Sequence, residues 1–158
     1  MPILEFQHVS KVYHNSTKAL DDLSFSVEEG EFLSIIGPSG AGKSTILRCI
    51  NRLIDATEGK IIYDGADVMQ GGKGQLRKIR TKTGMIFQHY NLVDRLSVME
   101  NVLHGRLGQK STFTGMIGHY TEAEKEKAFS ILSELGLAEQ AYKRCDALSG
   151  GQKQRVGI

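Results

Sequence analysis

Residues 37–44 have the types and the spacing of a loop that binds phosphate groups. They read Gly-Pro-Ser-Gly-Ala-Gly-Lys-Ser and fit the pattern G-x-x-x-x-G-K-S. Glycines let backbone N–H groups curl around a phosphate, and the helix that follows directs its positive end at the same anion. We therefore expect Lys43 to reach the β- and γ-phosphates of a nucleoside triphosphate, and the Ser44 hydroxyl to ligate Mg²⁺.

This phosphate loop (residues 37–44) needs a strand before it and a helix after it. Residues 32–36 form a near-continuous apolar run, which predicts a strand buried on both faces. Beyond the loop, apolar residues recur at helical spacing at positions 46, 47, 50, 53 and 54. A glycine-rich turn with a chance lysine is the alternative interpretation, and this context disfavours it.

A second glycine pair lies far downstream in residues 148–152, which read Leu-Ser-Gly-Gly-Gln. Ser149 and the two glycines precede a predicted helix that begins near Gln152. A serine and two glycines at a helix start form a second place where backbone N–H groups can face an anion. An ordinary helix N-cap is the alternative.

In their order along the chain, these motifs resemble those of the ATP-binding cassette (ABC) transporter ATPases, and the resemblance covers essentially the whole sequence. It implies binding of ATP with Mg²⁺ by a homodimer. Ser149 and Gly151 of one copy would face the γ-phosphate held by Lys43 of the other. The implied contacts of the phosphate loop come from Gly37, Ser39, Gly40, Gly42, Lys43 and Ser44, with Thr45 at the α-phosphate.

Two more residues take their roles from the resemblance. Tyr13, ahead of the phosphate loop, matches the aromatic residue whose ring stacks on adenine, and packing at a strand end is its alternative role. Gln88 follows residues 85–87, an apolar run expected to be a strand, and matches the family's glutamine that contacts Mg²⁺ and the attacking water. Gln88 is thus the catalytic candidate, and Ser44 and Gln88 are the expected metal ligands.

The implied fold is α/β: a P-loop ABC-type fold with a parallel core sheet, an antiparallel β subdomain and a helical subdomain. Residues 1–158 would form a partial ABC domain. Residues 1–95 would hold the β subdomain and the core up to Gln88, and residues 96–152 the helical subdomain with the signature motif (residues 148–152). The family's Walker B aspartate and glutamate would follow Ile158. We therefore expect the chain alone to expose unpaired strand edges and to bind ATP without turnover.

Local patterns predict the individual elements. Strands are expected at residues 3–8, 23–27 and 61–63, the last followed by an Asp-Gly turn. Ser97 with Glu100, and Thr121 with Glu124, have the spacing of capping boxes that begin helices. The second of these helices is expected to stop at Gly136, and residues 107–120 are expected to be a loop insertion.

Residues 67–83 are polar and basic, and their glycines predict a loop before a short helix. A solvated face is the default interpretation of their five cations, with anionic lipid or nucleic acid as the less favoured alternative. The whole chain has 158 residues and a net charge of +2, so we expect no nucleic-acid partner. Cys49 and Cys145 are isolated, which favours a reducing compartment.

Residues 47–53, 84–93 and 96–108 resemble the ATPase subunit of bacterial phosphonate importers. This resemblance implies membrane permease subunits as partners, a periplasmic phosphonate-binding protein acting indirectly, and a place on the cytoplasmic face of the bacterial inner membrane. Importers of phosphite, methionine or other amino acids are alternatives, as is a nucleotide-binding fragment without turnover. A third alternative is a soluble ABC protein of DNA repair or translation.

Overall fold

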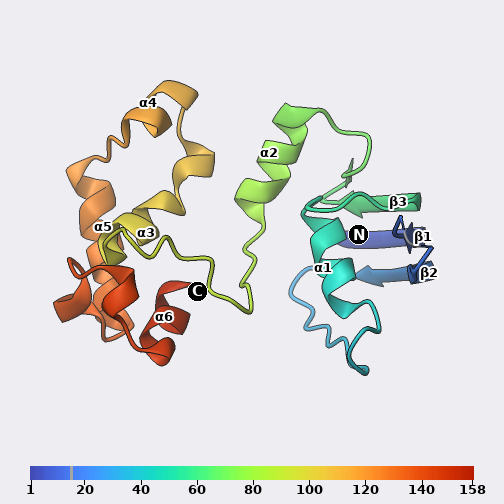
Figure 1. The fold of residues 1–158 in the computed structure, drawn as a ribbon. Coiled ribbons are helices and arrows are strands. Elements are labelled where there is room, and N and C mark those ends of the chain that lie inside the picture. Colours follow the sequence, from blue (N-terminus) through green and yellow to red (C-terminus); the bar gives the residue numbers. More distant parts are fainter. Residues whose placement is uncertain (15) are drawn as a thin grey trace. The chain divides into compact units, whose positions relative to one another are not determined.

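The computed structural model describes residues 1–14 and 16–158, and these form two compact units, Met1–Thr83 and Gly84–Ile158 (Figure 1). The first unit contains a β-sheet and two helices, and the second is built from helices. Each unit buries an apolar core of its own. No helix within the described residues combines the length and the apolar character needed to cross a membrane.

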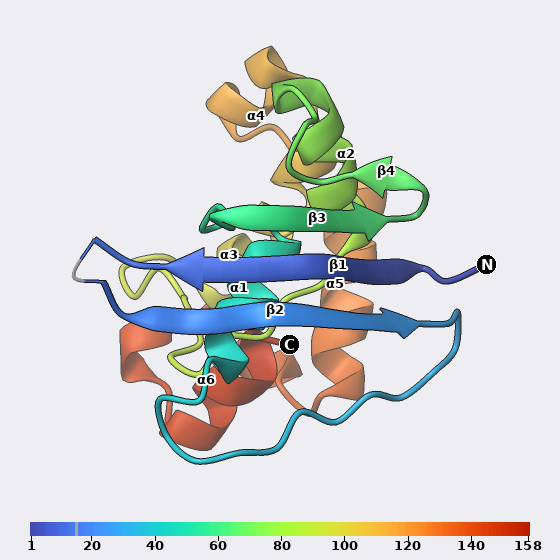
Figure 2. The ribbon, with the colours of Figure 1, turned by 90° about the vertical axis from the view of Figure 1, so that its right-hand side faces the viewer.

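The sheet of the first unit is antiparallel throughout, with strand order β2-β1-β3-β4 (Figure 2). The three predicted strands are confirmed, and each extends beyond its predicted bounds at one end. Asp64 and Gly65 both have positive φ, which fits the predicted tight turn between the last two strands. The strands are β1 (Leu4–Val12), β2 (Lys18–Val27), β3 (Glu58–Tyr63) and β4 (Ala66–Asp67).

Helices α1 (Lys43–Ile50) and α2 (Lys73–Lys82) complete the core of the first unit. In this core the rings of Phe6 and Phe25 stack across β1 and β2, with centroids 4.6 Å apart. Burial of Cys49 on α1 raises the pKa of its thiol to about 11, so the side chain is a neutral packing group. The buried core members are Phe6, Val9, Leu20, Ile46, Cys49, Ile61, Val68 and Ile79.

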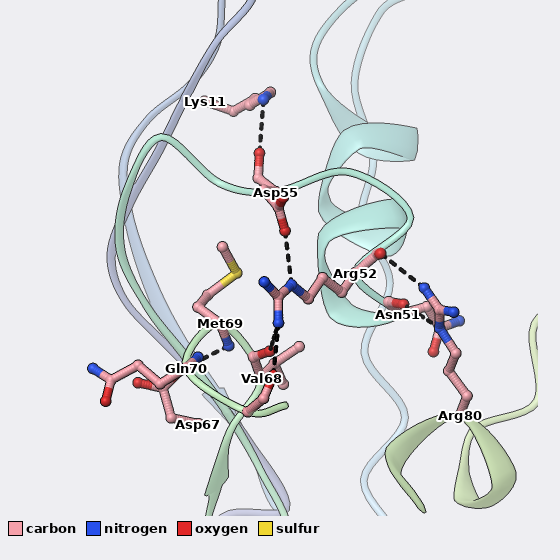
Figure 3. A network of polar contacts seen from close by, with 10 residues as sticks. Lys11, Asn51, Arg52, Asp55, Asp67, Val68, Met69, Gln70 and Arg80 are labelled. Carbon is pink, nitrogen blue, oxygen red and sulfur yellow. Dashed lines mark hydrogen bonds and ion pairs between the residues drawn. The ribbon is translucent and has the colours of Figure 1, made fainter. Parts of the chain in front are cut away.

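A polar network joins the end of α1 to α2 (Figure 3). Arg80 on α2 donates to the backbone oxygens of Asn51, at 3.0 Å, and Arg52, at 2.9 Å. The Arg52 guanidinium in turn donates to Asp55 Oδ1 at 2.8 Å and to the Gly71 oxygen at 2.9 Å. Carbonyls at a helix C-terminus lack partners within the helix, so Arg80 satisfies two of them at the end of α1 and ties α2 to that end.

The second unit contains four α-helices and three short 3-10 helices among its described residues. Both predicted capping boxes are present: Ser97 and Glu100 begin α3, and Thr121 and Glu124 begin α5. These helices bury Val98, Leu103 and Leu132 in one core. The elements are α3 (Val98–His104), η1 (Leu107–Gln109), α4 (Thr112–Ile117), α5 (Glu122–Glu134), η2 (Ala138–Gln140), η3 (Cys145–Ala147) and α6 (Gly150–Val156).

Helix α5 stops where the sequence predicts. Gly136 has φ 67°, its N–H donates to the Ser133 oxygen at 3.0 Å, and the Leu137 N–H donates to the Leu132 oxygen at 2.7 Å. This bond pair is a Schellman motif, which glycine supports because its left-handed conformation carries no Cβ penalty. The predicted loop at residues 107–120 is wrong in part, because η1 and α4 lie within it.

Two predicted strands of the parallel core sheet are absent. Residues 32–36 and 85–87 have no regular secondary structure, and Figure 2 shows the chain leaving β2 as an irregular segment that reaches α1. Phe32 is 92% exposed and Ile36 is 90% exposed, so the expected burial on both faces is wrong. A strand needs a hydrogen-bonded neighbour, and no described segment pairs with either run.

Glu124 links the start of α5 to the residues around η1. Its carboxylate accepts from Lys110 Nζ at 2.8 Å and lies 3.5 Å from Arg106 Nε. The Lys110 hydrogen bond and the Thr121 backbone N–H lower the pKa of Glu124 from 4.5 to about 2. An acid whose pKa is lowered by folding stabilises the fold above its unfolded pKa and loses that effect as the pH falls.

We predict that Glu124→Gln lowers the stability of the second unit at neutral pH. Because the lost ion pair matters only while the carboxylate is charged, the difference from the wild type should shrink from about pH 4.5 to about pH 2. Urea unfolding followed by circular dichroism across this range measures it. Glu126→Gln, on an exposed position of the same helix, is the control and should show no such trend. A constant difference at every pH would contradict the prediction.

Candidate nucleotide-binding site

The phosphate loop is shaped by glycines that no other residue could replace without strain. Gly40 and Gly42 both have φ 85°, in the left-handed region. A Cβ placed on Gly42 would lie 2.3 Å from the backbone oxygen of Ala19 on β2, whereas one on Gly40 would meet nothing within 4 Å. Gly42 is therefore the point at which the loop rests directly on the sheet.

Lys43 begins α1, and its side chain folds back over the loop. Its ammonium donates to the backbone oxygens of Gly37 and Pro38, both at 2.7 Å. The positive charge is thereby held inside the curve of the glycine loop. Both acceptors are neutral carbonyls, whereas a phosphate oxygen also carries negative charge that attracts the ammonium, so it is the better partner.

The start of α1 offers further donors to the same region. The backbone N–H groups of Gly42, Lys43 and Ser44 have no acceptor within the described residues. No acidic residue occupies the first turn of α1, so its positive end is not neutralised. Free N–H groups, an inward-facing ammonium and an exposed Ser44 hydroxyl together make a donor set that fits the phosphates of a nucleotide.

Tyr13 and Thr45 lie beside the loop in the same unit. Thr45 is only 8% exposed, and its hydroxyl oxygen lies 3.5 Å from the Tyr13 hydroxyl oxygen. Tyr13 follows β1 and is 36% exposed, with the Lys11 ammonium 5.3 Å from its ring centroid. The structure thus brings the predicted adenine-stacking residue next to the phosphate-loop helix. Stacking itself stays a prediction.

The signature motif lies in the second unit and begins α6. Ser149 is the N-cap: its hydroxyl accepts from the Gln152 N–H at 3.4 Å, and the Gln152 side chain accepts from the Ser149 N–H at 2.9 Å. This capping box starts the helix at Gly150, two residues before the predicted start. Ser149 and Gly151 are both exposed.

Gln88 lies in an exposed turn of the same second unit. The residues just after it contact the signature helix: Asp94 pairs with Lys153 at 3.3 Å, and a Cβ on Gly157 would lie 3.2 Å from the Tyr90 oxygen. Sequence reasoning missed this connection. Partners so far apart in the chain leave no local pattern that could have revealed it.

The site has few side chains of the types that commonly ligate metals. The described residues contain no group of three histidine, cysteine or acidic side chains that could hold a metal ion. The hydroxyl of Ser44 and the amide of Gln88 stay the predicted ligands of Mg²⁺. They belong to different compact units, the first with the phosphate loop and the second with the signature motif.

Comparison with known protein families shows the family to which this chain belongs. A family model described as ABC transporter matches residues 20–158, which include the phosphate loop, Gln88 and the signature motif. The chain belongs to the ABC transporter family. The antiparallel sheet and the helical second unit are consistent with the predicted ABC-type P-loop fold, although the predicted parallel core sheet is absent from the described residues.

Curated ABC relatives match the chain from end to end. It is 58% identical over 158 residues to the phosphonates import ATP-binding protein PhnC 2 of Oceanobacillus iheyensis, covering 100% of this chain and 62% of the relative. It is 55% identical over 156 residues to PhnC of Treponema denticola, covering 99% of this chain and 61% of that relative. The chain thus spans about three fifths of the length of these proteins.

Solved ABC structures agree. The dimeric structure of the bacterial ABC transporter cassette MJ0796 matches 98% of this chain and 67% of that one, with a TM-score of 0.85 and 32% identity. A post-hydrolysis dimer of MJ0796 bound to ADP and Pi matches with a TM-score of 0.83 and 34% identity, covering 98% of this chain and 66% of that one.

Replacing the two loop glycines should separate conformational strain from steric contact. Gly40→Ala introduces only a left-handed alanine and should destabilise the first unit by about 1 kcal/mol. Gly42→Ala adds the clash with the Ala19 oxygen and should cost about 3 kcal/mol or more. Urea unfolding of both variants measures the difference. Equal losses would mean that the loop does not rest on β2 at Gly42.

Proposed function

We propose that this chain is the nucleotide-binding part of an ATPase subunit that energises a bacterial membrane importer of phosphonates. The observation that carries the ATP-binding step is the phosphate loop, with Lys43 held inside its curve and free N–H groups at the start of α1. Membership of the ABC transporter family supports ATP hydrolysis as the energy source of the complete subunit.

In the proposed complex each residue acts on a particular part of ATP. Lys43 exchanges its two carbonyl acceptors for β- and γ-phosphate oxygens, and the N–H groups of Gly42 and Ser44 donate to the same phosphates. By the family resemblance, the Ser44 hydroxyl and the Gln88 amide would hold Mg²⁺, which would neutralise charge on the triphosphate. The Tyr13 ring covers one face of adenine.

The proposed subunit works as a homodimer. Ser149 and Gly151 of one copy complete the site of the other by turning the start of α6 toward its γ-phosphate. The capping box supports this role, because it fixes the first turn of α6 and leaves Ser149 at the surface. The dimeric cassettes among the similar structures support it as well.

Turnover requires more than these residues provide. Gln88 can orient a water molecule, but a glutamine amide is not basic enough to take its proton, and the family's Walker B pair does not occur in residues 1–158. We therefore propose that this chain alone binds ATP without hydrolysing it. Phosphate release by the purified chain would contradict this.

The transported substrate is proposed from the relatives, which are named as phosphonates import proteins. No residue described above contacts a transported molecule. Permease subunits in the bacterial inner membrane, served by a periplasmic binding protein, are the proposed partners, with this subunit on the cytoplasmic face. Phosphite, methionine or another amino acid is the alternative cargo.

Lys43→Ala should weaken ATP binding by the chain by about a hundredfold or more, because two charge-assisted hydrogen bonds to phosphate are lost. Isothermal titration with ATP and Mg²⁺ measures this loss. Lys127→Ala, an exposed lysine of the second unit, is the control and should bind as the wild type does. Unchanged binding by Lys43→Ala would refute the phosphate-loop assignment.

A matched pair at Tyr13 tests adenine stacking separately. Tyr13→Phe keeps the ring and should bind ATP nearly as well as the wild type. Tyr13→Ala should lose about tenfold for ATP, yet bind inorganic triphosphate normally, since stacking on a base is worth about 1–3 kcal/mol. Equal losses for both ligands would mean that Tyr13 only supports the fold through Thr45.

Cargo is tested in the native cell. Deleting the gene should abolish growth on a phosphonate as sole phosphorus source and leave growth on inorganic phosphate intact. Restoring the gene with Lys43→Ala should not rescue growth, because transport needs ATP. Normal growth on phosphonates, with a defect on phosphite or without methionine, would reassign the substrate and leave the ATP-binding proposal standing.

A further inference from the structure

Positive charge is concentrated on one helix of the first unit. Residues 68–93 contain five lysines and arginines and no aspartate or glutamate, although the net charge of the chain is only +2. All five cations fall within α2. The charge is therefore a local feature of this helix and not a property of the whole surface.

Part of the helix is used to anchor it. Ile79 is buried in the core, Arg80 donates to the backbone oxygens at the end of α1, and Lys82 pairs with Asp64 (Figure 3 shows the Arg80 contacts). These contacts lie on one side and at the C-terminal end of α2. They anchor the helix without using Lys73 or Lys78.

The outward face of α2 presents the other cations. Lys73, Arg77 and Lys78 are exposed, and Lys73 and Arg77 lie one turn apart on the same side. Lys73 and Lys78 have no acidic partner within residues 1–14 and 16–158. The first turn of α2 holds no acidic residue, so these charges add to the positive end of the helix.

We propose that this face of α2, formed by Lys73, Arg77 and Lys78, docks on the anionic phospholipid headgroups of a membrane. The positive charge of this face favours an anionic binding partner. The choice of a membrane rests on the proposed function, which puts the subunit beside a lipid bilayer. Each lysine or arginine near such a surface strengthens binding about fivefold, so Lys73 and Lys78 together provide about 25-fold.

Single-stranded nucleic acid is the other extended polyanion that fits a basic face. Sites for it interleave cations with aromatic side chains on which bases stack. No aromatic residue occurs between Lys73 and Lys82. A short row of cations on a rigid helix, with its apolar side turned inward, suits the headgroup layer better, because binding there needs charge without insertion.

The test is co-sedimentation of the full chain with vesicles of phosphatidylcholine alone or mixed with phosphatidylglycerol. The chain should bind the anionic vesicles only, and less as salt rises. Lys73→Gln with Lys78→Gln should reduce binding about 25-fold, and glutamine preserves helix propensity. The control, Lys127→Gln with Lys143→Gln, removes the same charge from exposed positions of the second unit and should change nothing.

The proposal would be overturned by no binding to anionic vesicles, by equal loss in the two double variants, or by tighter α2-dependent binding to a single-stranded oligonucleotide. Titration of the same samples with ATP separates this proposal from the nucleotide site. Lys43→Ala should lose ATP but keep the vesicles, and the α2 variant should lose the vesicles but keep ATP. Loss of both by the α2 variant with an unchanged circular dichroism spectrum would also count against a separate docking face.

Discussion

The contact between Gly42 and the Ala19 oxygen is the constraint on which the phosphate loop depends. The apolar run before the loop is not a strand, so the loop has no rigid lead-in from that side. The loop is instead positioned by the sheet and the core, because Gly42 contacts β2 and Ile46 and Cys49 of α1 are buried in the core. A side chain at position 42 would move the start of α1, and with it every N–H group that faces the phosphates.

In the second unit, the ends of the short helices are satisfied by nearby residues. Each capping box satisfies donors at a helix start with side chains only three residues away. The Schellman motif at Gly136 satisfies carbonyls at the end of α5 in the same local manner. Since these bonds are local, the helix bounds are fixed by short stretches of sequence, and the core has only to bring the helices together.

This difference explains how much could be predicted from the sequence. The hairpin at Asp64, the caps at Ser97 and Thr121, and the stop at Gly136 are set by neighbouring residues, and all four predictions are confirmed. Residues 32–36 and 85–87 failed as strands because a strand exists only with a paired neighbour, which an apolar pattern cannot supply. Phe129 of α5 is 40% exposed although the neighbouring Ala128 is buried, because helical spacing does not say how far a core extends.

The arginine network at the end of α1 has a mechanical consequence. Helix α1 is about 12 Å long, with the phosphate loop at one end and the hydrogen bonds from Arg80 at the other. Arg80 donates to main-chain oxygens, whose positions are fixed by the backbone and cannot change by side-chain rotation. If α1 tilts at its phosphate-loop end, its C-terminal carbonyls move in the opposite direction. Because Arg80 is bonded to those carbonyls, α2 moves with them.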